Sequence, residues 1–183
     1  MKRQHPCISL FHFCPRCGGR SLKPGSEKSL LCKECGLEYF FNPAAAVGVF
    51  LMDKQGKLLF VRRSRNPAKG KLGLPGGFVD AFERAEEAAV RELQEETSLR
   101  LSPSALSYLC SQTNSYSYHG VEYRSMDLYF TASLADGSEA KAMDECSEVL
   151  FLDPSGISPE EIAFDSLKKA LMVFNDIKKH KKL

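Results

Sequence analysis

The sequence predicts an α/β fold preceded by a small module that a metal ion closes. Residues 44–52 form a near-continuous apolar run, which is typical of a buried strand. Two later stretches, 85–97 and 165–177, carry apolar residues at helical spacing along one side. Strands mixed with helices in this way favour a sheet covered on both faces. Two Cys-x-x-Cys pairs near the start of the chain predict the metal-closed module.

The N-terminal module is predicted over residues 1–42 from its cysteines. The two pairs are separated by 14 residues, and each is followed by a glycine that lets the turn aim backbone N–H groups at the sulfurs. Four thiolates in a tetrahedron make a closed zinc site. A segment this short cannot build a stabilising core of its own, so it needs the bound metal to fold. A redox role for one pair is the competing interpretation. The four ligands would be Cys14, Cys17, Cys32 and Cys35.

The main domain is predicted over residues 43–183, after a boundary near residue 42. The apolar run at 44–52, a polar turn and a returning strand at 57–63 together predict a β-hairpin. Arg63 stands at the end of this hairpin, where an arginine either clamps a phosphate or faces solvent.

The helix at 85–97 has an acidic face. Glu92, Glu95 and Glu96 are related by i, i+3 and i+4 spacing, so their side chains project from neighbouring points. Like charges at this spacing weaken a helix by ~0.2–0.5 kcal/mol per pair. Carboxylate oxygens with room for water suit Mg²⁺ or Mn²⁺. We therefore expect a divalent cation between these glutamates, and the alternative is an acidic helix that faces solvent.

Two neighbouring features support a metal site on this helix. Arg91 lies four residues before Glu95, where it can orient the carboxylates and partly offset their repulsion. The Leu-Pro-Gly-Gly turn at 74–77 has little side-chain bulk, so its backbone can approach a ligand or a metal closely.

The rest of the chain predicts three strands and one helix. The strands lie at 106–112, 121–134 and 149–152, and the first two are joined around His119. The final helix is predicted to be capped by Asp165.

Composition limits the function classes. The chain has 183 residues, of which 43% are hydrophobic and 26% charged, with a net charge of +2, as in an ordinary globular protein. So small a net charge offers no basic field for nucleic acid, and no apolar run approaches the roughly 18 residues of a membrane span. Seven cysteines, an odd number, fit a reducing compartment better than a disulfide scaffold, which predicts a cytoplasmic protein.

The segment 77–99 resembles the Nudix box, the signature of the Nudix hydrolases. That box reads glycine, five residues, glutamate, seven residues, then Arg-Glu-aliphatic-x-Glu-Glu-x-Gly-aliphatic. The matching residues are Gly77, Glu83, Arg91, Glu92, Leu93, Glu95, Glu96 and Leu99, and Ser98 replaces the last glycine. The resemblance implies the Nudix α/β/α sandwich over about 43–183. It also implies hydrolysis, with Mg²⁺ or Mn²⁺, of a nucleoside diphosphate linked to another moiety.

Carried over to this chain, the resemblance implies a role for each residue of the box. The metal ligands would be Glu92, Glu95 and Glu96, with the Gly76 carbonyl as a further one, and Glu83 and Arg91 would orient that set. Family members often add a carboxylate from a later loop as metal ligand or general base. The candidates are Glu139, Asp144, Glu145 and Glu148, of which Glu145 is favoured because it stands shortly before the strand at 149–152.

The N-terminal module resembles a zinc ribbon, and a ribbon before a Nudix domain is the arrangement of NADH pyrophosphatases. Ser111-Gln112 begins the position where that family carries Ser-Gln-Pro-Trp-Pro-Phe-Pro, but the prolines and the tryptophan are missing here. ADP-ribose, NADH and nucleotide sugars are therefore the candidate substrates. Arg63 is the candidate phosphate contact, and Tyr116 and Tyr118 are candidates for stacking on a base, with half-buried strand tyrosines as the alternative.

Other functions stay open at this point. The domain could be a non-catalytic ligand sensor, or it could act on capped RNA with the ribbon as a docking module. The ribbon could pack on the catalytic domain or on a second subunit, as in a homodimer. A small-molecule nucleotide is the expected partner, whereas nucleic acid is disfavoured and no membrane contact is expected.

Overall fold

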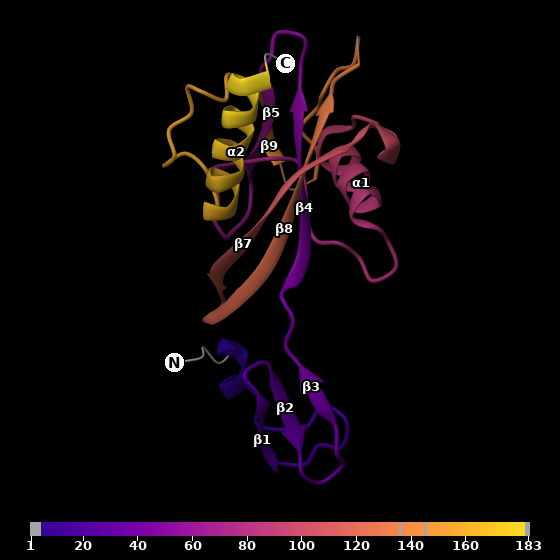
Figure 1. Ribbon diagram of the computed structural model, residues 1–183, viewed down its shortest axis with the longest axis vertical. Helices are drawn as coiled ribbons and strands as arrows, with labels where there is room; N and C mark the ends of the chain where they lie inside the picture. The colour runs from indigo at the N-terminus through magenta and orange to yellow at the C-terminus, as the bar shows by residue number, and fades with distance from the viewer. Residues whose placement is uncertain (1–4, 136, 145, 182–183) are drawn as a thin grey trace. The chain divides into compact units, whose positions relative to one another are not determined.

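The computed structural model describes residues 5–135, 137–144 and 146–181 (Figure 1). The chain divides into two compact units. The first comprises Met1–Pro43 with Tyr116–Arg124, and the second comprises Ala44–Ser115 with Ser125–Leu183. Each unit is described by itself below.

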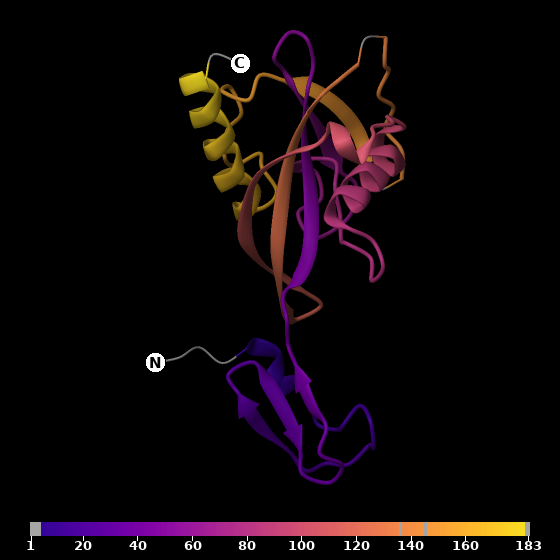
Figure 2. The same ribbon diagram turned by 45° about the vertical axis from the view of Figure 1, so that its right-hand side comes forward.

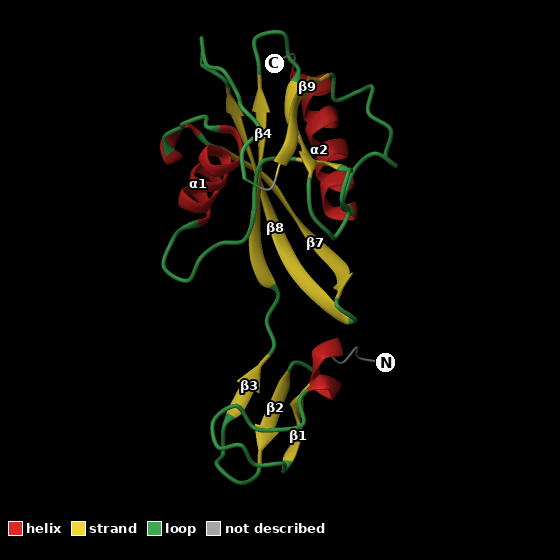
Figure 3. Cartoon of the chain, turned by 180° about the vertical axis from the view of Figure 1, so that it is seen from behind, coloured by secondary structure: helices red, strands yellow, loops and turns green. Residues whose placement is uncertain are grey.

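The first unit is a small antiparallel sheet with a short 3₁₀ helix beside it (Figure 3). The helix is η1 (Pro6–Leu10), and the strands, in the order β1-β2-β3, are β1 (Leu22–Ser26), β2 (Ser29–Cys32) and β3 (Glu38–Phe40). Among its described residues, the buried apolar cluster consists of Ile8, Leu30 and Phe41, with Cys7 and Leu22 packed against it. So small a core gives little stability to a segment of this length, which is the condition under which a structural metal matters.

The second unit is built on a mixed sheet of six strands. In sequence they are β4 (Ala44–Met52), β5 (Leu58–Arg63), β6 (Leu72–Gly73), β7 (Ser107–Tyr118), β8 (Val121–Ser133) and β9 (Cys146–Leu152). The spatial order is β6-β5-β4-β8-β7, and β9 pairs antiparallel with β5. β4 and β8 run parallel in continuous register from the Ala44–Ser125 pair to the Met52–Ser133 pair.

The two α-helices of the described residues cover opposite faces of this sheet (Figure 2). Alternating residues of β4 serve the two sides. Val49 and Leu51 pack in the cluster that includes Leu93 of α1 (Ala85–Thr97). Phe50 stacks on Phe174 of α2 (Asp165–Lys181), with the ring centroids 5.1 Å apart. The α/β sandwich expected from the sequence is confirmed, with a short 3₁₀ turn, η2 (Pro103–Ala105), after α1.

The predicted hairpin of 44–52 and 57–63 forms only next to its turn, where Met52 pairs with Leu58. Beyond that pair the two strands separate, and the segment 75–79 takes the place beside β4. The backbone N–H of Val47 donates to the Gly77 carbonyl (2.8 Å), and that of Val49 donates to the Pro75 carbonyl (3.0 Å). The glycine-containing turn is therefore held against the middle of β4.

Several element boundaries differ from those expected. β7 continues to Tyr118, and the chain reverses through His119 and Gly120, whose φ angles of 48° and 76° suit a tight hairpin turn. β9 begins three residues earlier than predicted, at Cys146. Asp165 is the first helical residue of α2 and accepts a hydrogen bond from Lys168 Nζ (2.8 Å), so it lies inside the first turn. Among the described residues, no helix has the length and apolar character needed to cross a membrane.

Candidate active site

The acidic face of α1 forms because the opposite face is buried. Ala88, Ala89, Leu93 and Thr97 are fully covered, which turns Glu92, Glu95 and Glu96 away from the core. The helix ends at Thr97, and the C-cap residue Ser98 adopts the left-handed conformation (φ 61°) and donates its N–H to the Gln94 carbonyl (2.9 Å). Ser98 thus takes the backbone conformation that usually favours glycine at this position.

Arg91 holds several carboxylates together. Its guanidinium donates two hydrogen bonds to Glu83, from Nη2 to Oε1 (2.6 Å) and from Nε to Oε2 (3.1 Å). Its Nη1 bridges Glu92 Oε1 (2.8 Å) and Glu95 Oε2 (3.0 Å). The Arg91 hydrogen bonds lower the pKa of Glu83, so that carboxylate stays charged. The orienting role expected for Glu83 and Arg91 therefore has a geometric basis.

Glu96 is the most deeply placed carboxylate of the helix face. Burial raises its pKa to about 7, and the charge of Glu92 adds to that rise. The backbone N–H of Gly76 donates to Glu96 Oε2 (3.1 Å) and opposes it. Burial also raises the pKa of Glu92, whose side chain is 17% exposed. Two half-buried carboxylates that disfavour each other's charge are the arrangement that a divalent cation stabilises.

The Gly76-Gly77 backbone fits tightly between β4 and the acidic helix. A Cβ on Gly77 would collide with the Glu92 carboxylate, and a Cβ on Gly76 would collide with the Val47 carbonyl oxygen. At Gly76, where the collision is with backbone, only a residue without a side chain lets the turn lie against the strand.

The cysteines predicted to bind metal are brought together in the first unit. Within the described part of the chain, Cys14, Cys17, Cys32 and Cys35 are the one group of three or more potential ligands whose ligand atoms all lie within 4.8 Å of one another. The Cys14–Cys35 and Cys17–Cys32 sulfur distances are 3.6 and 3.7 Å. The backbone N–H of Cys17 is the main cause that lowers the pKa of Cys14 to about 7. Although the Gly19 N–H lowers the pKa of Cys17, the Cys35 sulfur and burial outweigh that effect, so the pKa of Cys17 is raised instead.

The two Cys-x-x-Cys turns have the same local geometry. Gly18 and Gly36 adopt φ angles of 72° and 74°, and each donates its N–H to the carbonyl of the first cysteine of its pair, at 2.9 and 3.0 Å. The cluster can therefore hold a metal in a closed four-sulfur site. The carboxylates of the three glutamates on α1 lie farther apart than these four sulfurs, because the Arg91 guanidinium lies between Glu92 and Glu95.

Of the predicted substrate contacts, Arg63 belongs to the same unit as the acidic helix. Its positive charge lowers the pKa of Glu96, its Nε donates to the Pro67 carbonyl (2.9 Å), and its guanidinium lies 5.0 Å from the centre of the Phe164 ring. Sequence reasoning did not single out Phe164, since a lone phenylalanine before a helix carries no distinguishing signal.

The predicted tyrosines belong to the first unit rather than to the unit that carries α1. Tyr116 stacks on Tyr123 across the hairpin, with centroids 5.7 Å apart, and Tyr118 is 42% exposed. Of the candidate later carboxylates, Glu148 pairs with Arg62 (2.8 Å), while Glu139 and Asp144 are exposed. Glu145, the favoured candidate, lies outside the described residues.

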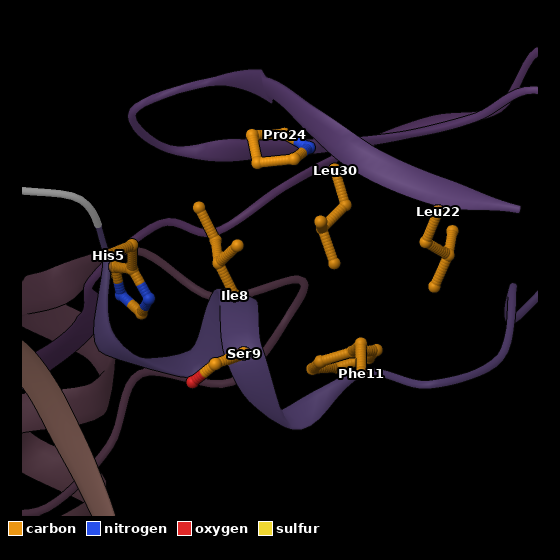
Figure 4. Close-up of a pocket in the computed structure, with 7 residues that line it drawn as sticks. All are labelled: His5, Ile8, Ser9, Phe11, Leu22, Pro24 and Leu30. Atoms are coloured by element: carbon orange, nitrogen blue, oxygen red, sulfur yellow. The ribbon is translucent and has the colours of Figure 1, made fainter.

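A groove lies in the first unit between η1 and the sheet. Figure 4 shows Ile8 and Phe11 on one side of it and Leu30 and Pro24 on the other. Its other lining residues are His5, Ser9 and Leu22, and none of the predicted site residues lines it.

The comparisons with known proteins agree with this geometry. The NUDIX domain family model matches residues 42–171. An ADP-ribose pyrophosphatase from Methanocaldococcus jannaschii is 37% identical over 129 residues, which are 70% of this chain and 72% of that protein. An NAD-capped RNA hydrolase NudC from Pseudomonas aeruginosa is 26% identical over 147 residues, or 80% of this chain. The match covers 49% of that NudC, so the chain spans about half its length.

Solved structures share the fold. A NUDIX hydrolase from Nitrosomonas europaea superposes with a TM-score of 0.66 at 24% identity, covering 93% of this chain and 94% of the other. The NUDIX domain of Shewanella oneidensis NrtR, solved with ADP ribose, superposes with a TM-score of 0.60 at 25% identity. That alignment covers 75% of this chain and 89% of the NrtR chain.

Proposed function

The chain belongs to the Nudix hydrolase family, and from that premise we propose that its acidic helix binds divalent metal and cleaves the pyrophosphate of a nucleoside diphosphate linked to another moiety. The observation that carries the proposal is the pair of half-buried carboxylates, Glu92 and Glu96, pressed against the Gly76-Gly77 turn. Burying two like charges side by side is costly unless a cation joins them.

We assign the metal site to Glu92, Glu95 and Glu96, with the Gly76 carbonyl as a further ligand. Hard oxygen ligands of this kind suit Mg²⁺ or Mn²⁺. When bound, the metal neutralises charge on the phosphates and lowers the pKa of a coordinated water. The chain's own residues prepare this site, because Arg91 and Glu83 hold the helix carboxylates in place and the Gly76 N–H orients Glu96.

Arg63 is proposed to contact a substrate phosphate, since its charge acts on Glu96 and a guanidinium recognises phosphate oxygens well. Tyr116 and Tyr118 are proposed base-stacking residues, and Glu145 is the proposed general base. The tyrosine and Glu145 assignments rest on residue type and position in the chain.

ADP-ribose is our first choice among the substrates, ahead of NADH and nucleotide sugars. The support is the archaeal relative named an ADP-ribose pyrophosphatase and the structural neighbour solved with ADP ribose. Addition of water across the pyrophosphate would yield AMP and ribose 5-phosphate, two phosphomonoesters.

We propose that the four-cysteine cluster binds zinc and that residues 1–42 form a zinc ribbon before a hydrolase domain at 43–183. Its support is the matched geometry of the two Cys-x-x-Cys turns. None of the seven cysteines forms a disulfide in the structure, which fits the reducing, cytoplasmic location that we propose.

A second candidate function is hydrolysis of capped RNA, favoured by exposed aromatic side chains in the first unit. Phe13 is 51% exposed with the Arg20 guanidinium 4.8 Å from its ring centre, and Tyr39 and Phe40 are 43% and 48% exposed. Bases stack on rings of this kind without strong sequence preference. The named NudC relatives support this candidate. A non-catalytic sensor is less favoured, because Glu92, Glu95 and Glu96 are all retained.

The test is a hydrolysis screen of the intact protein with Mg²⁺ or Mn²⁺ against ADP-ribose, NADH, a nucleotide sugar and a 5′-NAD-capped RNA. Products are identified by chromatography and mass spectrometry. We expect AMP and ribose 5-phosphate from ADP-ribose, with kcat/KM at its highest there. Efficient decapping, together with RNA binding that weakens steeply as salt rises, would instead establish the second candidate. If the protein binds one of these compounds but hydrolyses none of them, the non-catalytic ligand sensor would be the remaining interpretation.

A further inference from the structure

The ring of Phe164 lies against the guanidinium of Arg63. The Arg63 Cζ atom is over this ring, 5.0 Å from its centre, and both side chains are half-buried. The Nε of Arg63 donates a hydrogen bond to the Pro67 carbonyl (2.9 Å). Two contacts from different parts of the chain, an aromatic ring and a carbonyl, thus hold the guanidinium in place.

Backbone hydrogen bonds on both sides of Phe164 fix the position of its ring. Before it, the chain pairs with β6: the N–H of Leu72 donates to the Glu161 carbonyl (2.8 Å), and the N–H of Ala163 donates to the Leu72 carbonyl (2.9 Å). After it, the Phe164 carbonyl accepts from the Lys168 N–H (3.1 Å) at the start of α2. The ring therefore stands on a segment anchored to the sheet and to a helix.

The loop that carries Pro67 is closed in a similar way. The N–H of Arg63 donates to the Lys71 carbonyl (3.0 Å), and the N–H of Gly70 donates to the Arg63 carbonyl (2.8 Å). The carbonyl that receives the Arg63 Nε thus belongs to a loop whose two ends are tied together beside the arginine.

The end of β5 also lies close to the last turn of the acidic helix. Arg63 pairs in register with Cys146, the first residue of β9. The N–H of Cys146 donates to the Met143 carbonyl (3.0 Å), and the N–H of Met143 donates to the Glu96 carbonyl (3.0 Å). A short series of backbone contacts therefore connects Arg63 to the helix that carries the proposed metal ligands.

The contacts of Arg63 leave the far edge of its guanidinium for a ligand. Within the described part of the chain, no group accepts a hydrogen bond from its Nη1 or Nη2. The carboxylate next to Phe164, that of Asp165, is exposed and accepts from Lys168 Nζ instead (2.8 Å). The planar fork of an arginine matches two oxygens of a phosphate.

We propose that Phe164 is a positioning residue, whose ring holds the Arg63 guanidinium in the orientation that receives a phosphate of the nucleoside diphosphate substrate. The inference rests on the proposed function, because it needs Arg63 to contact that phosphate. A cation over an aromatic face gains an electrostatic attraction that an aliphatic side chain does not supply. Without the ring, the guanidinium has more freedom to lose on binding, so affinity falls.

The test compares Phe164→Leu with Phe164→Tyr in the full-length protein. kcat and KM are measured for ADP-ribose at saturating Mg²⁺. Binding of α,β-methylene-ADP, whose bridging carbon water does not displace, is measured by calorimetry with Mg²⁺. The leucine variant should raise KM and this Kd roughly 3- to 10-fold, the range expected for a half-buried cation over a ring. Its kcat should stay unchanged, because the phosphate contact is present in the ground state and the transition state alike. Tyrosine keeps the ring and should restore both constants.

Arg63→Met supplies the background in which the ring has nothing to orient. Phe164→Leu should weaken α,β-methylene-ADP binding no further in that background, since its effect passes through Arg63. Tyr108→Leu is the matched control, because Tyr108 is an aromatic side chain of the same unit, lies on β7 and is 59% exposed. It should leave KM and Kd unchanged.

Wild-type KM and Kd in a folded Phe164→Leu protein would overturn the inference. An equal loss of affinity with and without Arg63 would overturn it too, because the ring would then act through another group. Circular dichroism checks folding, and Phe164→Met replaces the leucine variant if that variant fails to fold. If the wild-type protein hydrolyses none of the substrates, the proposed function fails, whereas the α,β-methylene-ADP measurements still decide the role of Phe164.

Discussion

Glu96 combines burial with the metal-binding role that we propose for it, and the burial has a cost that can be measured. In the folded protein its pKa is about 7, well above the ordinary glutamate value of 4.5. A carboxylate kept in so unfavourable a place needs a compensating partner, which a divalent cation supplies. Arg91 supplies positive charge to the neighbouring carboxylates in the same way. It donates hydrogen bonds to Glu83, Glu92 and Glu95.

Replacing Glu96 by glutamine should reduce kcat by at least about 100-fold, because a metal ligand is lost while the volume is kept. Steady-state hydrolysis of ADP-ribose measures this effect, and circular dichroism checks the fold. Glu86→Gln is the control, since it removes the same charge from the first turn of the same helix. Near-normal kcat in the Glu96 variant would contradict the metal assignment.

Without added divalent metal, the free energy of unfolding should fall as pH rises from about 4.5 to about 7. Between these values the folded protein holds a proton on Glu96 that the unfolded chain has released, so raising the pH favours unfolding. The effect is on the order of 2–3 kcal/mol. Urea denaturation across this pH range measures it. The decrease of the unfolding free energy with pH should be smaller in Glu96→Gln. An identical decrease in that variant would mean that other groups cause the pH dependence.

At the scale of elements, the ends of α1 decide how the acidic face is presented. The helix stops at Ser98, a non-glycine residue in the left-handed conformation. The segment 137–144 then covers the exposed carbonyls of the last turn through Lys141 and Met143. The left-handed conformation of Ser98 thus costs conformational free energy at a residue outside the acidic face of the helix.

Ser98→Gly should raise the free energy of unfolding by about 1 kcal/mol, because glycine adopts the left-handed conformation without a Cβ clash. Chemical denaturation measures the gain, and hydrolytic activity should not change. Ser98→Ala keeps the Cβ and should show no such gain. Equal stability of the glycine and wild-type proteins would mean that the serine conformation carries no strain.

At the scale of the whole molecule, the two units differ in what stabilises them. The second unit has two apolar clusters, one on each side of its sheet. The first unit has a core of three buried residues and a cluster of four sulfurs. We therefore expect the first unit to depend on its metal and the second on apolar burial.

Cys32→Ser should release zinc and unfold the first unit, because a four-sulfur site that loses one thiolate loses most of its affinity. Zinc content measured by elemental analysis should fall from about one per chain to near zero. Cys7→Ser, outside the cluster, should retain the metal. Unchanged zinc in the Cys32 variant would show that the ribbon assignment is wrong.

The local patterns of the sequence predicted much of the fold and the likeness to the Nudix family. The apolar run at 44–52, the acidic helix and the helix at 165–177 all form, since each depends on periodicity within its own segment. The family match over 42–171 confirms the likeness. The hairpin of 44–52 and 57–63 is different, because the 75–79 segment competes for β4, and local pattern does not reveal that competition.

The sequence by itself determined which candidate metal ligands lie together, carboxylates on one helix face and two pairs of thiols, because their spacing follows from local geometry. Only the tertiary structure decided which groups surround each ligand. The N–H of Gly76 and the charge of Arg63 come from two separate segments and both act on Glu96. Contacts between residues far apart in the chain depend on how the strands pair, and that pairing is set by the burial of the whole sheet.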